Sequence, residues 1–254
     1  MAISIIGGGR VGGALADLCA ERGLPCHLIT RDAGWEALGA PAGEPVLVTV
    51  RNDDLDGVLA RLPAQRRGDL VLIQNGMLRP WIRARGLDGV TRGLLFFAVS
   101  RRGDRPEPGG ASPFTGPHAE AVVAWLSRLE IPAEVVGAGE FAAVELEKLI
   151  WNSAFGLLCQ VHAESVGTIV DGRAAQLRAL VAEMAAVGEA ALAVPLELDP
   201  LFDRLCAYSR SIASYRGAVK EWPWRNGWFV QAAKERAVAT PVHDGLLAQA
   251  GLAG

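Results

Sequence analysis

Residues 3–12 read Ile3-Ser4-Ile5-Ile6-Gly7-Gly8-Gly9-Arg10-Val11-Gly12, and this stretch decides the fold. The apolar run at 3–6 predicts a buried strand, and the helical spacing of apolar residues over 13–20 predicts a helix directly after the glycines. A strand, a G-x-G-x-x-G turn and a helix in this order form the arrangement that binds a dinucleotide. The start of the helix would offer free N–H groups and a partial positive charge to the phosphates.

Each glycine of the motif has a mechanical reason in a dinucleotide site. Gly7 permits the tight turn, Gly9 lets the backbone approach the pyrophosphate, and Gly12 allows the helix to lie close to the strand. An ordinary glycine-rich turn is the competing interpretation, because the chain contains 30 glycines. The strand before the motif and a second strand after the helix favour the dinucleotide site. The predicted cofactor contacts here are Gly7, Gly8, Gly9, Arg10, Val11 and Gly12.

The end of the second predicted strand, 26–30, bears on the choice between NAD and NADP. In this fold a side chain about 20 residues past the glycines meets the adenosine ribose, where an acid suits the 2′-hydroxyl and an arginine suits a 2′-phosphate. Arg31 lies 19 residues after Gly12, and Asp32 follows it. Because the arginine comes first, the sequence favours NADP. The alternative is a salt-bridged surface pair at a strand end.

The rest of the chain divides into an alternating part and a helical part. Further strands are expected at 46–50, 69–73, 94–99 and 132–136, with helices at 55–62 and 119–129 and an edge strand at 113–115. From residue 140 onward the spacing is helical, at 140–161, 181–192, 201–213 and 223–236. The predicted fold is α/β, with a Rossmann-type doubly wound sheet over 1–137 and an all-helical domain over 138–254.

Composition excludes several classes of function. The net charge of −3 gives no reason to expect nucleic acid as a partner. No apolar stretch approaches the roughly 20 residues of a membrane span. The four cysteines show no C-x-x-C spacing and the four histidines no ligand spacing, so no metal is expected. Scattered unpaired thiols are typical of the reducing cytoplasm, which is the predicted location.

The predicted helix at 140–161 carries a lysine and an amide on one face. Lys148 and Asn152 are four residues apart, in a row that is otherwise mostly apolar. In one interpretation Lys148 lies along a surface stripe and pairs with Glu145. In the other, both side chains face a cofactor and bind a 2-oxo acid. The ammonium would then protonate the carbonyl oxygen as hydride arrives, while the amide would hold that oxygen.

The order of motifs resembles the ketopantoate reductase family over nearly the whole chain. The shared features are the glycine motif, a strand that ends in an Asn-Gly turn, a helix with a lysine and an asparagine four apart, a serine-containing stretch, and a glutamate six residues before a glycine. In this chain they are Gly7, Gly9 and Gly12; Gln74-Asn75-Gly76; Glu147-Lys148-Leu149-Ile150-Trp151-Asn152; Ser211-Ile212; and Glu221 with Gly227.

The resemblance implies an activity and roles for residues. Members reduce 2-ketopantoate with NADPH in pantothenate biosynthesis. Lys148 would be the acid and Glu221 a second catalytic residue, which orients the substrate. The substrate would also meet Asn75, Asn152 and Ser211. Arg31, Arg51, Asn75 and Ala98 would join the glycine motif in binding NADPH. The partners implied are a small 2-oxo acid and, through the helical domain, a second copy of the chain.

Departures from the family pattern leave the substrate open. The chain is short for the family, Arg51 replaces a lysine, and Ser209 competes with Ser211 as the substrate serine. Three tryptophans near Glu221 belong either to a core or dimer interface or to the acyl pocket. An opine- or hydroxyacid-type dehydrogenase is one alternative, because it also carries a lysine and an asparagine on such a helix. A non-catalytic nucleotide sensor or scaffold is the other.

Overall fold

The computed structural model describes residues 2–39 and 42–252. The chain divides into two compact units, Met1–Phe141 and Ala142–Gly254, which are described separately below. The helix that joins them, α5 (Ala138–His162), begins four residues before this division.

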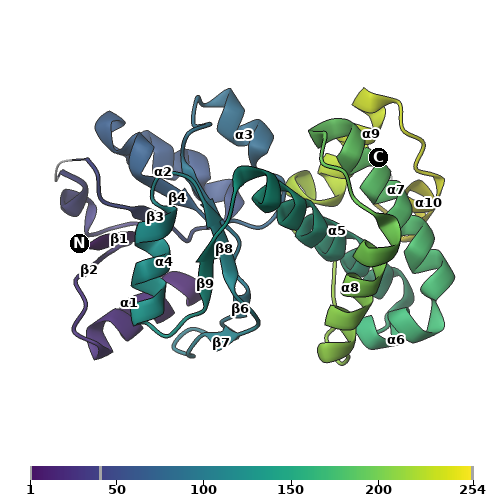
Figure 1. Ribbon diagram of the computed structural model, residues 1–254, viewed down its shortest axis with the longest axis horizontal. Helices are drawn as coiled ribbons and strands as arrows, with labels where there is room; N and C mark the ends of the chain where they lie inside the picture. Colours follow the sequence, from purple (N-terminus) through teal and green to yellow (C-terminus); the bar gives the residue numbers. More distant parts are fainter. Residues whose placement is uncertain (1, 40–41, 253–254) are drawn as a thin grey trace. The chain divides into compact units, whose positions relative to one another are not determined.

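The first unit is built on one seven-stranded sheet (Figure 1). Its order is β2-β1-β3-β4-β5-β8-β9, and every neighbouring pair is parallel except β5 with β8. The strands are β1 (Ile3–Ile6), β2 (Cys26–Ile29), β3 (Val46–Val48), β4 (Leu70–Leu72), β5 (Thr91–Gly93), β8 (Ser112–Thr115) and β9 (Ala133–Val135). The reversal of strand order at β1 is the switch point of a doubly wound sheet, which confirms the predicted fold class.

Helices cover the sheet on its faces (Figure 1). Helices α1 (Arg10–Glu21) and α4 (Ala119–Arg128) share one hydrophobic core with β1, β3 and β4, in which Leu15 of α1 and Val122 of α4 are fully buried. Helices α2 (Leu55–Arg61) and α3 (Arg79–Ala84) are linked by a hydrogen bond of 3.1 Å from the indole of Trp81 to Asp56. The helix at 55–62 was expected, whereas the short α3 was not.

The strand predicted at 94–99 is wrong in its position. The sheet strand is β5 at Thr91–Gly93, and only Phe97–Ala98 (β6) is extended within the predicted range, where it pairs with Glu107–Pro108 (β7) in a separate two-stranded sheet. The prediction followed the apolar run at 94–99, whereas β5 consists of a threonine, an arginine and a glycine and shows no such run. The glycine is required, since a Cβ on Gly93 would lie 2.2 Å from the ring of Phe114.

Residues 113–115 were expected to form an edge strand, and this prediction is wrong. They belong to β8, which lies inside the sheet between β5 and β9, and Phe114 is fully buried. Pro113 has no N–H to donate to the sheet, and its carbonyl accepts a hydrogen bond of 3.0 Å from Leu94 N–H.

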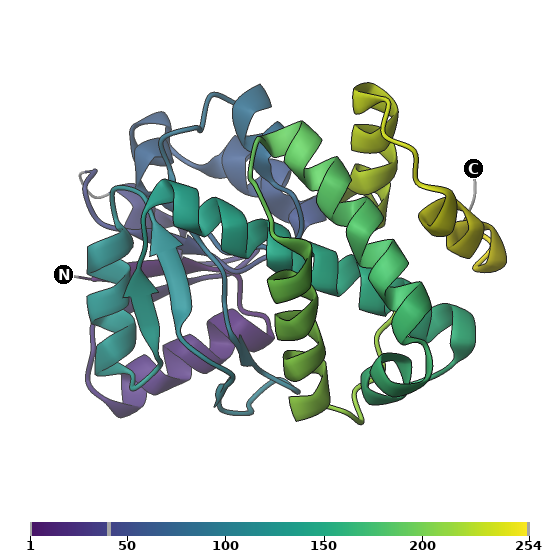
Figure 2. The ribbon, with the colours of Figure 1, turned by 45° about the vertical axis from the view of Figure 1, so that its right-hand side comes forward.

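The second unit is helical, as predicted, and α7 is its central element (Figure 2). Helix α7 (Ala174–Leu192) contacts α6 (Val166–Gly172), α8 (Leu198–Ser211), α9 (Asn226–Arg236) and α10 (Pro241–Gln249). Neither α6 nor α10 was predicted, and Pro223 lies in the short helix η4 (Trp222–Trp224) rather than in α9. Among residues 2–39 and 42–252, no helix combines the length and the apolar character that a membrane span requires.

Three helices of the second unit end at an alanine in the left-handed conformation. Ala163, Ala193 and Ala237 follow α5, α7 and α9 with φ of 55°, 54° and 53°. Glycine is the usual residue at such an end, because a Cβ makes this conformation unfavourable. The ends of these helices are therefore set by tertiary packing, and not by the conformational preference of the residue at the end.

A fully buried histidine connects three elements of the second unit. His243 Nε2 lies 3.1 Å from Nδ2 of Asn226, whose amide is also 3.3 Å from the carbonyl of Ser153 in α5. The backbone N–H of His243 donates to Glu183 of α7 at 2.9 Å. Burial lowers the pKa of His243 to about 4, although the nearby Asp244 opposes this shift. The imidazole is therefore neutral in the folded protein at neutral pH.

We expect the free energy of unfolding to fall with acidification below about pH 6.5. The unfolded state takes up a proton near the ordinary histidine pKa of about 6.5, whereas folded His243 resists protonation down to about 4. The loss between these values is roughly 2–3 kcal/mol. Urea titrations across this pH range should show a shallower dependence in His243→Gln than in the exposed-site control His27→Gln. Equal slopes in the two variants would contradict this assignment.

Candidate functional site

The glycine turn of the first unit is built as a tight junction between β1 and α1. Gly7 has a φ of +118°, and its N–H donates to the carbonyl of Ile29 in β2 at 2.8 Å. A Cβ on Gly12 would lie 1.9 Å from the carbonyl oxygen of Gly7, which no shift of a side chain could relieve. A Cβ on Gly9 would meet nothing within 4 Å. Open space above Gly9 is what a bound pyrophosphate needs.

Thr49, immediately after β3, stabilises this turn through its hydroxyl group, and no role was predicted for it from the sequence. Its hydroxyl oxygen lies 3.0 Å from the carbonyl of Ile6 and 2.9 Å from that of Gly7. A Cβ on either Gly7 or Gly12 would come within 2.7 Å of this oxygen. The available signal was a hydroxyl residue at the carboxyl end of a buried parallel strand, where ligands bind in such sheets.

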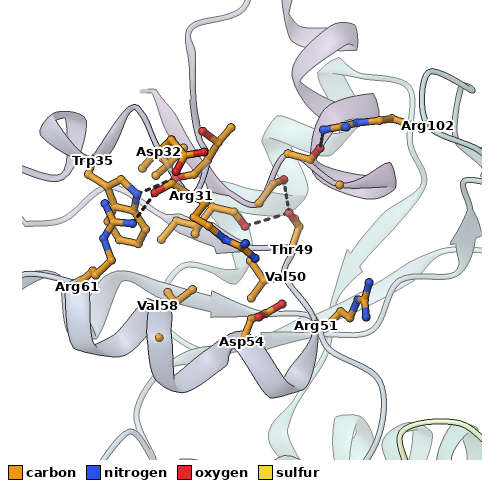
Figure 3. Close-up of a pocket in the computed structure, with 17 residues that line it drawn as sticks. Arg31, Asp32, Trp35, Thr49, Val50, Arg51, Asp54, Val58, Arg61 and Arg102 are labelled. Carbon is orange, nitrogen blue, oxygen red and sulfur yellow. Dashed lines mark hydrogen bonds between the residues drawn. The ribbon is translucent and has the colours of Figure 1, made fainter.

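A pocket of about 590 Å³ opens beside the turn (Figure 3). Of the predicted cofactor residues, Gly7, Gly8, Gly9, Arg31 and Arg51 line it. Arg10, Val11 and Gly12 lie in the first turn of α1 and are not part of the lining. The pocket therefore brings together the glycine turn and the arginine that follows β2.

Two further residues at one end of the pocket were not predicted (Figure 3). The guanidinium carbon of Arg61 lies 3.9 Å from the ring centroid of Trp35, and Arg61 Nη1 donates to the carbonyl of Arg31 at 2.6 Å. The indole N–H of Trp35 donates to the carbonyl of Thr30 at 2.7 Å. This stack fixes the chain around Arg31, and its flat faces suit an adenine ring.

The other end of the pocket is marked by Arg102 (Figure 3). Its guanidinium donates to the carbonyl of Gly8, which draws the loop after β6 onto the glycine turn. Four arginines line the pocket against two aspartates: Arg31, Arg51, Arg61 and Arg102, with Asp32 and Asp54. An excess of positive charge fits a ligand with several phosphates, so the residues present fit a dinucleotide.

Asn75 and Ala98 lie in the same unit but outside the lining of this pocket. Asn75 follows β4, and its carbonyl accepts a hydrogen bond of 2.9 Å from the side chain of Asn52. Gly76 continues the turn with a φ of +94°. Ala98 is exposed in β6. Asn75 is thus held firmly at the carboxyl end of the sheet.

In the second unit, Lys148 and Asn152 lie one turn apart on α5, as expected. Both side chains are partly buried, and Asn152 Nδ2 donates to the carbonyl of Lys148 at 2.9 Å. The pKa of Lys148 is lowered to about 7, first by burial and second by the positive charge of Arg225. A lysine with such a pKa can both hold and release a proton near neutral pH.

Arg225 precedes α9 and was not predicted to have a role. Its Nη2 lies 2.6 Å from Oε2 of Glu221, four residues earlier. Glu221 adopts the left-handed conformation with a φ of 49°, which is costly for a residue with a Cβ. Glu221 and Lys148, the two predicted catalytic residues, thus both interact with Arg225. The available signal was an arginine within the motif that contains Glu221.

The two candidate substrate serines have different surroundings. Ser209 is fully buried, accepts a hydrogen bond of 2.9 Å from the indole of Trp151 and donates to the carbonyl of Leu205. Ser211 is exposed at the end of α8, and its hydroxyl donates to the carbonyl of Tyr208. Ser209 therefore stabilises the contact of α8 with α5, and Ser211 is the more accessible of the two. Within residues 2–39 and 42–252, no three histidine, cysteine or acidic side chains are grouped as metal ligands.

Comparisons with known proteins agree with the motifs. Residues 140–252 match the family model of the C-terminal domain of ketopantoate reductase PanE/ApbA. A PanE/ApbA family ketopantoate reductase from Ralstonia eutropha JMP134 has a TM-score of 0.79 at 19% identity, over 99% of this chain and 98% of that one. A 2-dehydropantoate 2-reductase from Methylococcus capsulatus has a TM-score of 0.78 at 19% identity, over 99% and 96%.

A D-mandelate dehydrogenase solved with NADH has a TM-score of 0.76 at 16% identity, over 99% of this chain and 98% of that one. No curated protein sequence matches the chain. At these identities the solved structures establish the fold, and the family model identifies the second unit. Residues 140–252 are therefore similar to the C-terminal domain of ketopantoate reductases, and the fold over the whole length is that of solved structures described as ketopantoate reductases.

Proposed function

We propose that the protein is an NADPH-dependent reductase of a 2-oxo acid, with ketopantoate or a relative of it as the substrate. The observation that carries this proposal is Lys148, a partly buried lysine with a pKa of about 7 in a ketopantoate reductase C-terminal domain. Such a lysine is suited to give a proton to a carbonyl oxygen at neutral pH. NADPH, when bound, supplies the hydride.

In this proposal, residues of the chain donate the proton and bind the substrate. Lys148 Nζ gives its proton to the oxygen of the reduced carbonyl, so that the product leaves as a 2-hydroxy acid. Asn152 retains its side-chain oxygen and a second N–H for holding the substrate, because only one N–H is used in the bond to Lys148. Asn75 and Ser211 remain candidates for contacts with the acyl group, and Glu221 for its hydroxyl end.

The glycine turn and the arginines of the pocket hold the cofactor in this proposal. Backbone N–H groups at Gly8, Gly9 and the start of α1 face the pyrophosphate, where the helix dipole favours negative charge. Arg31 takes the 2′-phosphate of NADPH, and Arg51 adds positive charge nearby. The order of residues after β2 supports NADPH over NADH, since the arginine precedes the aspartate.

Replacement of Arg31 by alanine should weaken NADPH binding about 10–100-fold, because a charge-assisted hydrogen bond to the phosphate is lost. NADH binding should change little, since NADH has no 2′-phosphate. Titration of both cofactors against wild type and Arg31→Ala, with quenching of tryptophan fluorescence as the signal, measures both affinities. The exposed Arg67→Ala, outside the pocket, is the matched control. Equal affinities of wild type for the two cofactors would refute the NADP assignment.

Activity is tested by following NADPH absorbance with a panel of 2-oxo acids that includes ketopantoate and benzoylformate. The fold neighbour named D-mandelate dehydrogenase is the reason for the aromatic acid, and it keeps a hydroxyacid dehydrogenase as the second candidate function. Binding of NADPH without reduction of any acid would favour the sensor or scaffold alternative. We also propose a cytoplasmic location and a homodimer through the second unit, in line with a neighbour described as a dimeric ketopantoate reductase.

A further inference from the structure

The guanidinium of Arg225 is buried with an incomplete set of acceptors. Its side chain is only 10% exposed, and Nη2 is paired with Glu221. The Nε atom is buried and has no hydrogen-bond partner. Guanidinium groups carry five N–H donors, and buried charges are normally paired and fully hydrogen-bonded. The unused donor therefore marks a position where an acceptor is missing.

The surroundings of Arg225 are also positively charged. Its charge disfavours protonation of Lys148, so the two cations lie within electrostatic reach of each other. Helix α9 begins at the next residue and directs the positive end of its dipole to the same place. Glu221 contributes one negative charge, but its side chain is one-third exposed and bonds to only one nitrogen of the fork. A further anion would satisfy both the charge and the donor.

The arginine is also held in place relative to the lysine. The next residue, Asn226, is fully buried and donates to the carbonyl of Ser153 on α5, the helix that carries Lys148. The carbonyl of Arg225 accepts from Phe229 N–H at 3.2 Å, and its own N–H donates to the carbonyl of Trp222 at 3.2 Å. These bonds fix the backbone of Arg225, and Glu221 holds one nitrogen of its guanidinium, so the side chain binds a planar anion without a large cost in side-chain entropy.

We propose that Arg225 binds the carboxylate of the 2-oxo acid, so that the adjacent carbonyl oxygen faces Lys148. A carboxylate matches the planar fork of arginine, and in a 2-oxo acid it is bonded directly to the carbonyl carbon. The Glu221–Arg225 pair then orients the fork and leaves Nε and the remaining donors to the substrate. This assignment rests on the proposed function, because it takes Lys148 as the proton donor.

The test compares a 2-oxo acid with its methyl ester, which keeps the carbonyl and loses the charge. Wild type should prefer the acid over the ester in kcat/KM by about 10–100-fold, the usual worth of a hydrogen bond to a charged group. Arg225→Gln should abolish that preference, and Arg225→Lys should restore part of it. Arg204→Gln, which removes an exposed arginine of α8 that pairs with Glu147, is the matched control and should keep the preference.

A purely structural role would lower activity on acid and ester equally and leave their ratio unchanged, which would overturn the proposal. If Arg225→Gln does not fold, the ratio of kcat/KM for acid and ester is compared between wild type and Arg225→Lys. A wild-type protein that does not prefer the acid over the ester refutes the proposal. Calorimetry with oxamate and methyl oxamate separates this proposal from the proposed function. Oxamate binding that is lost in Arg225→Gln supports the carboxylate site even where no acid is reduced. Equal binding of oxamate by wild type and Arg225→Gln contradicts it.

Discussion

Lys148→Ala is expected to lower turnover by about a hundredfold or more, because a positioned proton donor is typically worth ~10²–10⁴ in rate. Hydride addition places negative charge on the carbonyl oxygen, and without Lys148 that charge is no longer neutralised in the transition state. Folding and NADPH affinity should be largely preserved, since the pocket proposed for the cofactor lies in the first unit. Steady-state kinetics, NADPH titration and a thermal melt measure the three properties, with the exposed Lys234→Ala as the control.

The pH dependence provides an independent check of Lys148. Its pKa is lowered to about 7, so the ammonium form, which is the proposed proton donor, predominates below this value and is lost above it. Reduction should therefore slow as pH rises through about 7, with a single proton lost. Lys148→Ala should lack this limb of the profile. A variant that retains more than about a tenth of wild-type turnover would show that another group is the acid.

Gly12→Ala is expected to disable cofactor binding. The new Cβ would lie 1.9 Å from the carbonyl oxygen of Gly7 and 2.4 Å from the Thr49 hydroxyl, so α1 must move away from β1. Overpacking of this kind typically costs about 1–3 kcal/mol in stability. Displacement of α1 would also move the N–H groups that are proposed to bind the pyrophosphate. NADPH affinity should fall at least about tenfold, in line with the same energy.

Gly13→Ala is the matched control for Gly12→Ala. A Cβ at Gly13 would meet only the carbonyl oxygen of Gly8, at the ordinary contact distance of 3.9 Å. Replacement of a glycine by alanine inside a helix stabilises by roughly 0.5–1 kcal/mol where space allows. Gly13→Ala should therefore melt at the same or a higher temperature and keep its NADPH affinity. Similar losses in both variants would mean that helix α1, rather than the contact at Gly12, limits binding.

The features that could be predicted from the sequence depend on local patterns. The glycine motif, the alternating first part, the helical second part and the placement of Lys148 and Asn152 on one helix all follow from residue spacing. The strand β5 could not be predicted, because Thr91, Arg92 and Gly93 owe their extended form to their neighbours β4 and β8 and to the ring of Phe114. Tertiary pairing overrides local propensity in such strands.

The site was only partly predictable for a related reason. Arg61 is 30 residues from Arg31, whose carbonyl it binds, and Arg102 is 94 residues from Gly8. Such contacts depend on how the sheet brings distant loops together, and no spacing along the chain encodes them. Arg225 lies within a recognised motif, but its burial and its partner Glu221 become visible only once η4 and α9 are in place.

The left-handed alanines after α5, α7 and α9 make this protein unusually open to stabilisation by design. Each of them adopts a conformation that costs an L-residue roughly 1 kcal/mol, and glycine relieves that cost at the price of a more flexible unfolded chain. Ala163, Ala193 and Ala237 lie in different helix–loop junctions, so their small gains should add together. The helical unit thus holds a reserve of stability that replacement of these three alanines by glycine could release.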